Sequence, residues 1–233
     1  MGGLAGQVAV VTGTSRGIGR AIAASFAKAG AAVAGCARGG RGGSFLEDLS
    51  SEEQSRCRHA ACDVRVQADV LRFRAEVEAA LGAPDIVVNN AGIVTRAPAL
   101  DLAVETWNDV LAANLTGTFL VTQAFLGEMK SRKHGRIINL ASIAGRTGTA
   151  MLSAYCAAKH GVVGLTRAWA EEFRADGIAV NAICPGSVDT EMLKQGMPDG
   201  APKMSADDVA RVALFLAAEA PLALTGACID VFG

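Results

Sequence analysis

Tyr155 and Lys159 are the pair of residues in this sequence with the clearest capacity for acid–base chemistry. Tyr155 is the only tyrosine in the chain, and Lys159 follows four residues later within a helical pattern, so both side chains project from one helix face. A free phenol has a pKa of about 10 and is a poor proton shuttle at neutral pH. A neighbouring ammonium, together with a second positive charge from a bound ligand, is expected to lower that pKa by about 1–3. Taken alone, the pair would also fit an ordinary helix contact with tyrosine in the core.

Ser142 adds a hydroxyl at the carboxyl end of a predicted strand, residues 136–141. Such strand ends line the crevice in which open α/β sheets bind ligands. A hydroxyl there would orient a carbonyl, and Tyr155 would then act as a general acid for a carbonyl or as a base for an alcohol. Together with Lys159, the three residues predict a site of proton transfer.

A glycine-rich loop at residues 12–19 stands between the first predicted strand and the first predicted helix. Gly13 permits a tight turn, Gly17 lets the backbone approach a pyrophosphate, and Gly19 lets helix and strand pack closely. The N–H groups and the positive end of the helix favour an anionic ligand. The spacing is G-x-x-x-G-x-G, and a glycine trio alone would also fit a plain tight turn. Its place between strand and helix favours phosphate binding.

Short runs rich in β-branched residues alternate with longer helical patterns along the whole chain. Strands are predicted at residues 7–12, 32–37, 56–62, 85–89, 136–141, 178–184 and 227–231. Helices are predicted at residues 17–29, 67–81, 106–131, 154–176 and 205–218. This alternation predicts βαβ crossovers and a parallel sheet covered on both faces. We therefore expect one α/β domain over residues 1–233, a Rossmann-like, doubly wound parallel sheet of about seven strands with helices on both faces.

Composition excludes several classes of protein. The chain is 51% hydrophobic and 19% charged, with a formal net charge of −1, which argues against a disordered protein and against one that coats nucleic acid. No run reaches the roughly 18 uncharged apolar residues of a membrane span, and no secretory signal pattern leads the first strand. The six cysteines form no C-x-x-C pair, which is typical of reduced thiols. A cytoplasmic location is expected.

Five further landmarks complete a resemblance to the short-chain dehydrogenase/reductase family. They are Asp63, Asn89-Asn90-Ala91-Gly92, Asn114, Ser142 with Tyr155-x-x-x-Lys159, and Pro185-Gly186 followed by Thr190. The resemblance covers essentially the whole chain, and the subgroup that looks most similar is the 3-oxoacyl-carrier-protein reductases. It implies an oxidoreductase that transfers a hydride between a nicotinamide cofactor and a ketone or 3-oxoacyl substrate, or the matching secondary alcohol. No metal is expected, because hydroxyls supply the electrophilic assistance.

The resemblance implies a role for each catalytic residue. Ser142 would polarise the carbonyl and stabilise the developing oxyanion, and Tyr155 would supply the proton. Lys159 would tune Tyr155, helped by the positive charge of an oxidised nicotinamide, and would bind the nicotinamide ribose. Asn114 would hold a water that links Lys159 to bulk solvent.

The resemblance also implies a cofactor-binding set that runs through the whole chain. Its members are Gly13, Ser15, Arg16, Gly17, Ile18, Gly19, Arg38, Asp63, Val64, Asn90, Ala91, Gly92, Tyr155, Lys159, Pro185, Gly186, Val188 and Thr190. Asp63 would bond the adenine amino group and Val64 the neighbouring ring nitrogen. Residues 90–92 would pass beside the adenosine ribose. Residues 185–188 would hold the carboxamide, with Thr190 reaching the nicotinamide or its phosphate.

Two arginines favour NADP(H) over NAD(H). An acidic residue at the end of the second strand selects NAD in this fold, whereas a nearby arginine accommodates a 2′-phosphate. That place holds Ala37, and Arg38 follows. Arg16, in the glycine loop, adds a second guanidinium, and two of these can clamp one phosphate. The alternative is that both are solvated loop charges.

A short segment at residues 191–204 occupies the place of the substrate lid within the same domain. It is shorter than usual for the family and lacks an obvious helical pair. An apolar, adaptable lining is predicted from its flexible side chains, Met192, Leu193, Met197 and Met204. A basic run at residues 130–134 would suit an acidic carrier protein, but Asp176 stands where related reductases tend to be basic, which disfavours a carrier partner.

The predicted helices 106–131 and 154–176 resemble those that pair in the family's four-helix interfaces, which favours a homotetramer, with a dimer second. The substrate is expected to be a small carbonyl or alcohol, with neither nucleic acid nor membrane as partner. One alternative is an NAD(P)-dependent alcohol or sugar dehydrogenase working in the oxidative direction. A second is a non-catalytic NADP(H)-sensing protein, which the intact Ser142, Tyr155 and Lys159 set disfavours. A methyltransferase is less consistent still, because the tyrosine–lysine pair has no role there.

Overall fold

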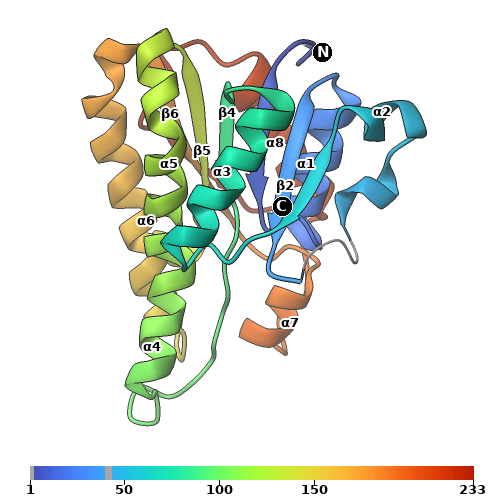
Figure 1. The fold of residues 1–233 in the computed structure, drawn as a ribbon. Helices are drawn as coiled ribbons and strands as arrows, with labels where there is room; N and C mark the ends of the chain where they lie inside the picture. The colour runs from blue at the N-terminus through green and yellow to red at the C-terminus, as the bar shows by residue number, and fades with distance from the viewer. Residues whose placement is uncertain (1–2, 40–43) are drawn as a thin grey trace.

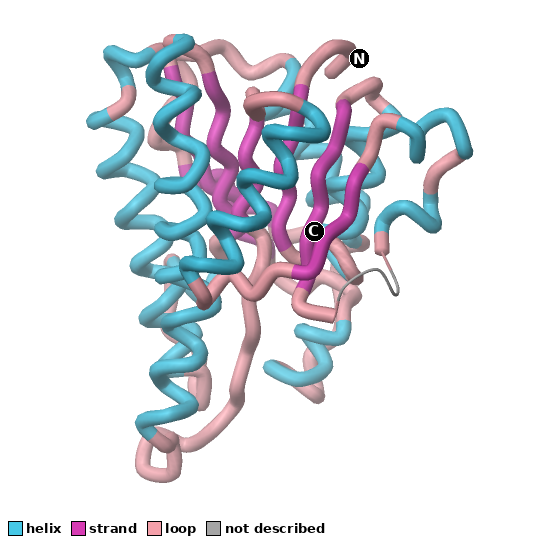
Figure 2. Tube along the Cα trace, viewed as in Figure 1, coloured by secondary structure: helices cyan, strands magenta, loops and turns pink. Residues whose placement is uncertain are grey.

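The structure of the chain is a computed structural model that describes residues 3–39 and 44–233. The described residues form one sheet of seven parallel strands in the order β3-β2-β1-β4-β5-β6-β7 (Figure 2). Their bounds are Val8–Thr12 for β1, Ala32–Ala37 for β2, Arg58–Ala61 for β3, Ile86–Asn89 for β4, Gly135–Leu140 for β5, Ile178–Pro185 for β6 and Cys228–Val231 for β7. The predicted fold class is confirmed. A glycine-rich run, residues 38–43, follows the second strand in the sequence and is expected to form a loop; its residues 40–43 lie outside the described part.

The strand order reverses between β1 and β4. β1 pairs with β2 on one side and with β4 on the other, and a reversal of this kind leaves a crevice at the carboxyl ends of the strands. β6 is buried along its whole length, as expected for a parallel strand covered on both faces.

Helices cover the two faces of the sheet in separate layers (Figure 1). On one face α1 (Gly17–Lys28) packs against α8 (Ala206–Ala218). The other face carries α3 (Gln67–Leu81), α5 (Gly117–Arg132) and α6 (Ser153–Glu172). The first layer buries Ile22, Phe26, Val209 and Leu216, and the second buries Phe73, Phe125, Met129 and Trp169.

Two long helices are interrupted where the sequence predicts continuity. The predicted helix 106–131 is divided into α4 (Val104–Leu111), a π-helical turn at Ala112–Thr116, and α5. The predicted helix 154–176 ends as an α-helix at Glu172 and continues as a 3-10 turn at Arg174–Asp176. Periodicity did not reveal either change, because a single wider or tighter turn hardly shifts the apolar spacing.

Short helices are the elements that the sequence analysis missed. α7 (Glu191–Gly196) forms within the predicted lid, for which no obvious helical pair was expected, and the Thr190 hydroxyl accepts a hydrogen bond from the Leu193 N–H at 3.3 Å. α2 (Ser51–Ser55) was missed as well, although the reciprocal bonds of Ser50 and Glu53 form a capping box that the sequence spacing would have allowed.

The stretch Val104–Arg132 is long and apolar enough, by length and composition, to cross a membrane. Half of its most apolar window is buried inside the protein. Within it, α5 packs against α3 and against the strands β4 and β5. Such burial is typical of a core helix in a globular protein.

Candidate active site

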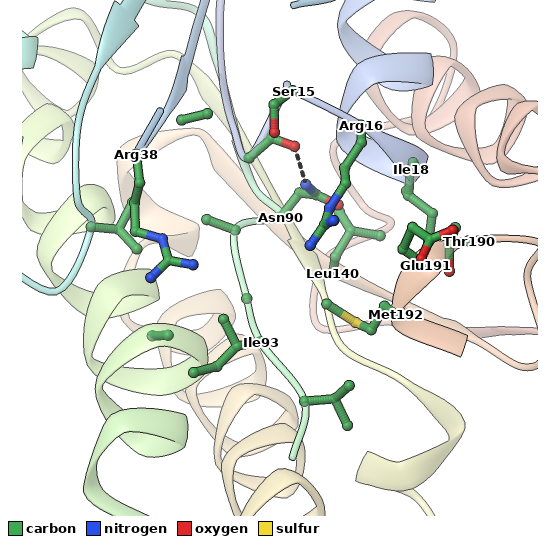
Figure 3. A pocket seen from close by; sticks show the side chains of 18 of the residues that line it. Ser15, Arg16, Ile18, Arg38, Asn90, Ile93, Leu140, Thr190, Glu191 and Met192 are labelled. Atoms are coloured by element: carbon green, nitrogen blue, oxygen red, sulfur yellow. Dashed lines mark hydrogen bonds between the residues drawn. The ribbon is translucent and has the colours of Figure 1, made fainter. Parts of the chain in front are cut away.

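A cavity of about 570 Å³ opens at the carboxyl ends of the strands and reaches the start of α7 (Figure 3). It brings together most of the predicted catalytic and cofactor-binding residues, and fifteen of those twenty line it: Gly13, Ser15, Arg16, Gly17, Ile18, Arg38, Asp63, Val64, Asn90, Ala91, Gly92, Tyr155, Lys159, Pro185 and Thr190. Five others do not line it, namely Gly19, Asn114, Ser142, Gly186 and Val188. The cavity therefore joins segments far apart in the chain.

Residues that do not line the cavity contact the lining residues and hold them in place. A Cβ on Gly19 would collide with the Asn90 side chain and the Gly13 carbonyl oxygen, so only glycine allows the first turn of α1 to lie this close to Asn90 and Gly13. Asn90 in turn donates from Nδ2 to the carbonyl oxygens of Thr12 at 2.8 Å and Gly13 at 3.2 Å. The carbonyl oxygen of buried Val188 accepts the Thr190 hydroxyl at 3.2 Å.

The glycine loop presents an open, positive helix end to the cavity. Gly13 has a φ of +75°, which favours glycine, and α1 carries no acidic residue in its first turn. Arg16 is the N-terminal cap residue of that helix and is exposed. The unpaired N–H groups and the helix dipole both favour an anion at this position.

Arg16 and Arg38 both extend toward the cavity from opposite walls (Figure 3). Both are exposed, and neither guanidinium hydrogen-bonds or ion-pairs with a residue in the described ranges. Ala37, at the end of β2, lines the cavity beside them. Two cations that face one space are suited to a phosphate group.

Asp63 is already engaged by a residue that the sequence analysis did not name. Arg65 donates to its carboxylate from Nη2 at 2.7 Å and from Nε at 3.0 Å, and this pairing lowers the pKa of Asp63. Arg65 also reaches Asp109 of α4 at 3.2 Å and lines the cavity. The sequence could have indicated this ion pair, because Asp63 and Arg65 carry opposite charges two residues apart.

Tyr155 and Lys159 lie one turn apart on α6, as their spacing predicts, and both are buried, with exposed fractions of 9% and 4%. Lys159 donates from Nζ to the Leu140 carbonyl oxygen at 2.6 Å. The same Nζ lies 5.6 Å from the centre of the Tyr155 ring. Ser142 follows β5, and its hydroxyl accepts the Ala144 N–H at 3.1 Å while also bonding Tyr155.

The fall in the pKa of Tyr155, which was predicted with a positively charged nicotinamide beside the phenol, is not present in the protein alone. Burial of the phenol raises its pKa to about 12, and the hydrogen bond with Ser142 opposes this only in part. Burial also lowers the pKa of Lys159 to about 8. Both directions follow from desolvation, which disfavours the charged form of each group. The spacing of the two residues in the sequence does not reveal how far water is excluded from the site.

Asn114 lies in the π-helical turn that interrupts the long helix. Its Nδ2 donates to the carbonyl oxygens of Ile93 at 2.8 Å and Val110 at 2.9 Å. Its Oδ1 is buried and has no hydrogen-bond partner in the described part of the chain. A Cβ placed on Gly92 would clash with that oxygen and lie 3.8 Å from Lys159 Nζ. The orphaned oxygen and the ammonium therefore border one small space, and π turns are frequent at functional sites.

The lid contributes one of the four flexible side chains predicted to line the cavity. Met192 lines it, and the Tyr155 hydroxyl lies 3.8 Å from the Met192 Sδ. Leu193, Met197 and Met204 do not line it. Met204 is instead buried in the core layer of α1 and α8, and Met197 is 39% exposed. Only Leu193 of these three lies in α7, and Met197 and Met204 follow the helix.

The basic run at residues 130–134 lies at the other end of the sheet. It ends where β5 begins, so the length of a six-residue strand, about 20 Å, separates it from the cavity. Two of its cations are also paired, Lys130 with Asp176 at 3.0 Å and Arg132 with Asp85 at 2.8 Å. The basic run is therefore separate from the cavity that holds Tyr155.

Comparison with known proteins agrees with this geometry. The family model described as short chain dehydrogenase matches residues 7–199. The chain belongs to the short-chain dehydrogenase family. It is 37% identical to D-threitol dehydrogenase of Mycolicibacterium smegmatis, over 99% of this chain and 93% of that protein. It is 35% identical to the 3-oxoacyl-(acyl-carrier-protein) reductase of Aquifex aeolicus, over 99% of this chain and 97% of that protein.

Solved structures place the short-chain dehydrogenase fold over the whole chain. A gluconate 5-dehydrogenase from Burkholderia cenocepacia, in complex with NADP and tartrate, superposes with a TM-score of 0.87. It is 31% identical and covers 99% of this chain and 95% of that one. This protein is accordingly an oxidoreductase that transfers hydride between a nicotinamide cofactor and a carbonyl or alcohol. No group of three or more His, Cys, Asp or Glu residues within residues 3–39 and 44–233 could hold a metal ion.

Proposed function

We propose that this protein reduces a ketone to a secondary alcohol with NADPH. The observation that carries the proposal is the joining, in one cavity, of two unpaired arginines and a buried tyrosine–lysine pair backed by a hydroxyl. The arginines fit a phosphorylated dinucleotide, which supplies the hydride when bound. The buried groups fit proton transfer to the carbonyl oxygen.

Tyr155 donates its proton to the carbonyl oxygen, and the Ser142 hydroxyl donates to the same oxygen as its charge develops. Lys159 stabilises the charge that forms on Tyr155 and binds the nicotinamide ribose. The orphaned Asn114 Oδ1 holds a water that returns a proton through Lys159. What supports this relay is the small space shared by Oδ1 and Nζ.

The raised pKa of Tyr155, about 12, keeps the phenol protonated at neutral pH in the protein alone, which is the form that donates to a ketone. Oxidation of an alcohol would require phenolate, which this dry site disfavours until a positively charged nicotinamide lies beside it.

Arg16 and Arg38 bind the 2′-phosphate and select NADP(H) over NAD(H). The remaining cofactor contacts follow the cavity wall: the loop from Gly13 to Gly19 binds the pyrophosphate, Asp63 and Val64 the adenine, Asn90 to Gly92 the adenosine ribose, and Pro185 to Thr190 the nicotinamide. The Arg65 bond leaves acceptor capacity on the Asp63 carboxylate for the adenine amino group.

A polyol dehydrogenase working in the oxidative direction is the second candidate, because two of the similar proteins are named as threitol and gluconate dehydrogenases. A carrier-bound 3-oxoacyl substrate is a third, supported by the similar reductases. The intact set of Ser142, Tyr155 and Lys159 argues against a non-catalytic sensor. We further propose a cytoplasmic homotetramer assembled through α4, α5 and α6, whose outer face exposes Val104 and Phe119.

Consumption of NADPH and NADH would be compared across a panel of carbonyls: a 3-oxoacyl thioester, a β-keto ester, a diketone and a keto-sugar. Polyol oxidation with NADP⁺ would be run beside it. We expect ketone reduction with a preference for NADPH. A preference for NADH would contradict the assignment of Arg16 and Arg38, and polyol oxidation alone would favour the second candidate.

A further inference from the structure

The Tyr155 hydroxyl has a second neighbour that the proposed mechanism does not use. Met192 of α7 places its Sδ 3.8 Å from the phenol oxygen, in the geometry of an O–H···S hydrogen bond. Met192 is half-buried and lines the cavity, and, like Ile93 and Val94, it packs against the buried cluster that contains Tyr155. The thioether therefore accepts the hydrogen that a ketone oxygen must accept during reduction.

α7 is fixed against the segment that follows β4, so this contact is determined by the fold. The Gly196 carbonyl oxygen accepts a hydrogen bond from Arg96 Nη1 at 3.3 Å. A Cβ on Gly196 would lie 3.1 Å from Val94 Cγ2, so the end of the helix packs closely on Val94. At its start, Thr190 caps the helix.

The properties of a thioether allow a substrate to displace Met192 from the Tyr155 hydroxyl. A thioether sulfur is a weak acceptor, so a carbonyl oxygen competes well for the phenol hydrogen. The side chain has three rotatable bonds and a polarizable sulfur, which let it repack beside an alkyl group. Once displaced, it remains next to the carbonyl substituent that faces the lid.

We propose that Met192 determines which ketones the enzyme accepts. It accepts the hydrogen bond of the Tyr155 hydroxyl before substrate binds, and it then packs against the substituent on the lid side of the carbonyl. The inference rests on the proposed function and adds a substrate class to it: ketones whose lid-side substituent is an unbranched alkyl chain. Branched substituents meet the pinned helix and are disfavoured.

The first test measures kcat/KM with NADPH for matched ketones with unbranched and branched substituents. We expect Met192→Ala to raise the branched-to-unbranched ratio of kcat/KM by about tenfold, the effect of a methylene or two in an apolar pocket. Met192→Leu keeps the volume and should change the ratio little. Met197→Ala, on the exposed side of the same lid, is the matched control. An unchanged ratio in Met192→Ala would overturn the proposal.

A second readout needs no turnover, because Tyr155 is the only tyrosine and phenolate absorbance reports it alone. Met192→Ala admits water and should move the onset of ionisation to lower pH, with circular dichroism confirming that the protein stays folded. Met192→Gln offers a stronger acceptor for the neutral phenol and should move the onset of Tyr155 ionisation to higher pH. Identical phenolate titrations in the wild-type protein and in both Met192 variants would overturn the contact between Met192 and the Tyr155 hydroxyl. Shifted titrations with no ketone reduced would overturn the proposed function instead.

Discussion

The two halves of the cavity hold charge in opposite ways. Around the glycine loop, Arg16 and Arg38 are exposed and face a shared space. Around α6, Tyr155 and Lys159 are buried, and desolvation moves the pKa of each toward its neutral form. The first half selects an anion by charge while water still surrounds it. The second half prepares proton transfer by excluding water, so its chemistry depends on packing.

Removing the phenol should have the largest effect. Tyr155→Phe deletes the proton donor and leaves the packing of the ring, so we expect kcat to fall by about 10²- to 10⁴-fold. Steady-state reduction of the best ketone measures it. Loss of less than tenfold would show that another group supplies the proton.

The buried cation should affect stability, in a direction that depends on pH. The folded-state pKa of Lys159, about 8, lies below its unfolded value, so between about pH 8 and 10.5 the unfolded chain binds more protons and stability rises with pH. The cost of burial at neutral pH is on the order of 3 kcal/mol. Unfolding free energies of the wild-type protein and of Lys159→Met should therefore diverge least at high pH. A constant difference would contradict the burial argument.

Each arginine of the exposed half should contribute less, and to binding alone. Arg38→Ala and Arg16→Ala each remove charge-assisted hydrogen bonds of about 1.5–3 kcal/mol, so the Kd for NADPH should rise by roughly 10- to 100-fold. The Kd for NADH should stay the same, and added salt should reduce the difference. Equal weakening of both cofactors would show that the arginines act on the fold.

The smallest effect is expected from the ion pair between Arg65 and Asp63. Both side chains are partly exposed, at 26% and 21%, and such pairs contribute about 0–1 kcal/mol. Arg65→Gln should lower the unfolding free energy by less than about 1 kcal/mol, measured by urea denaturation. A larger loss would place this pair with the buried groups.

The same contrast explains what the sequence could predict. The sheet, the glycine loop and the helix that carries Tyr155 and Lys159 follow from short-range patterns, and the structure has them where they were expected. The π turn at Asn114 and the helix α7 were missed because one altered turn or six residues carry almost no periodic signal. The raised pKa of Tyr155 in the protein alone was not predicted, because spacing places Lys159 nearby without revealing that both groups are desolvated.

One half of the cavity is proposed to bind NADPH while the other performs the chemistry. Calorimetric titration of NADPH into Tyr155→Phe, paired with its ketone reduction, separates the two. Because Tyr155 is one of many predicted cofactor contacts, we expect the Kd for NADPH to change far less than kcat, with reduction lost. NADPH binding weakened as much as reduction, or reduction that persists, would overturn this division.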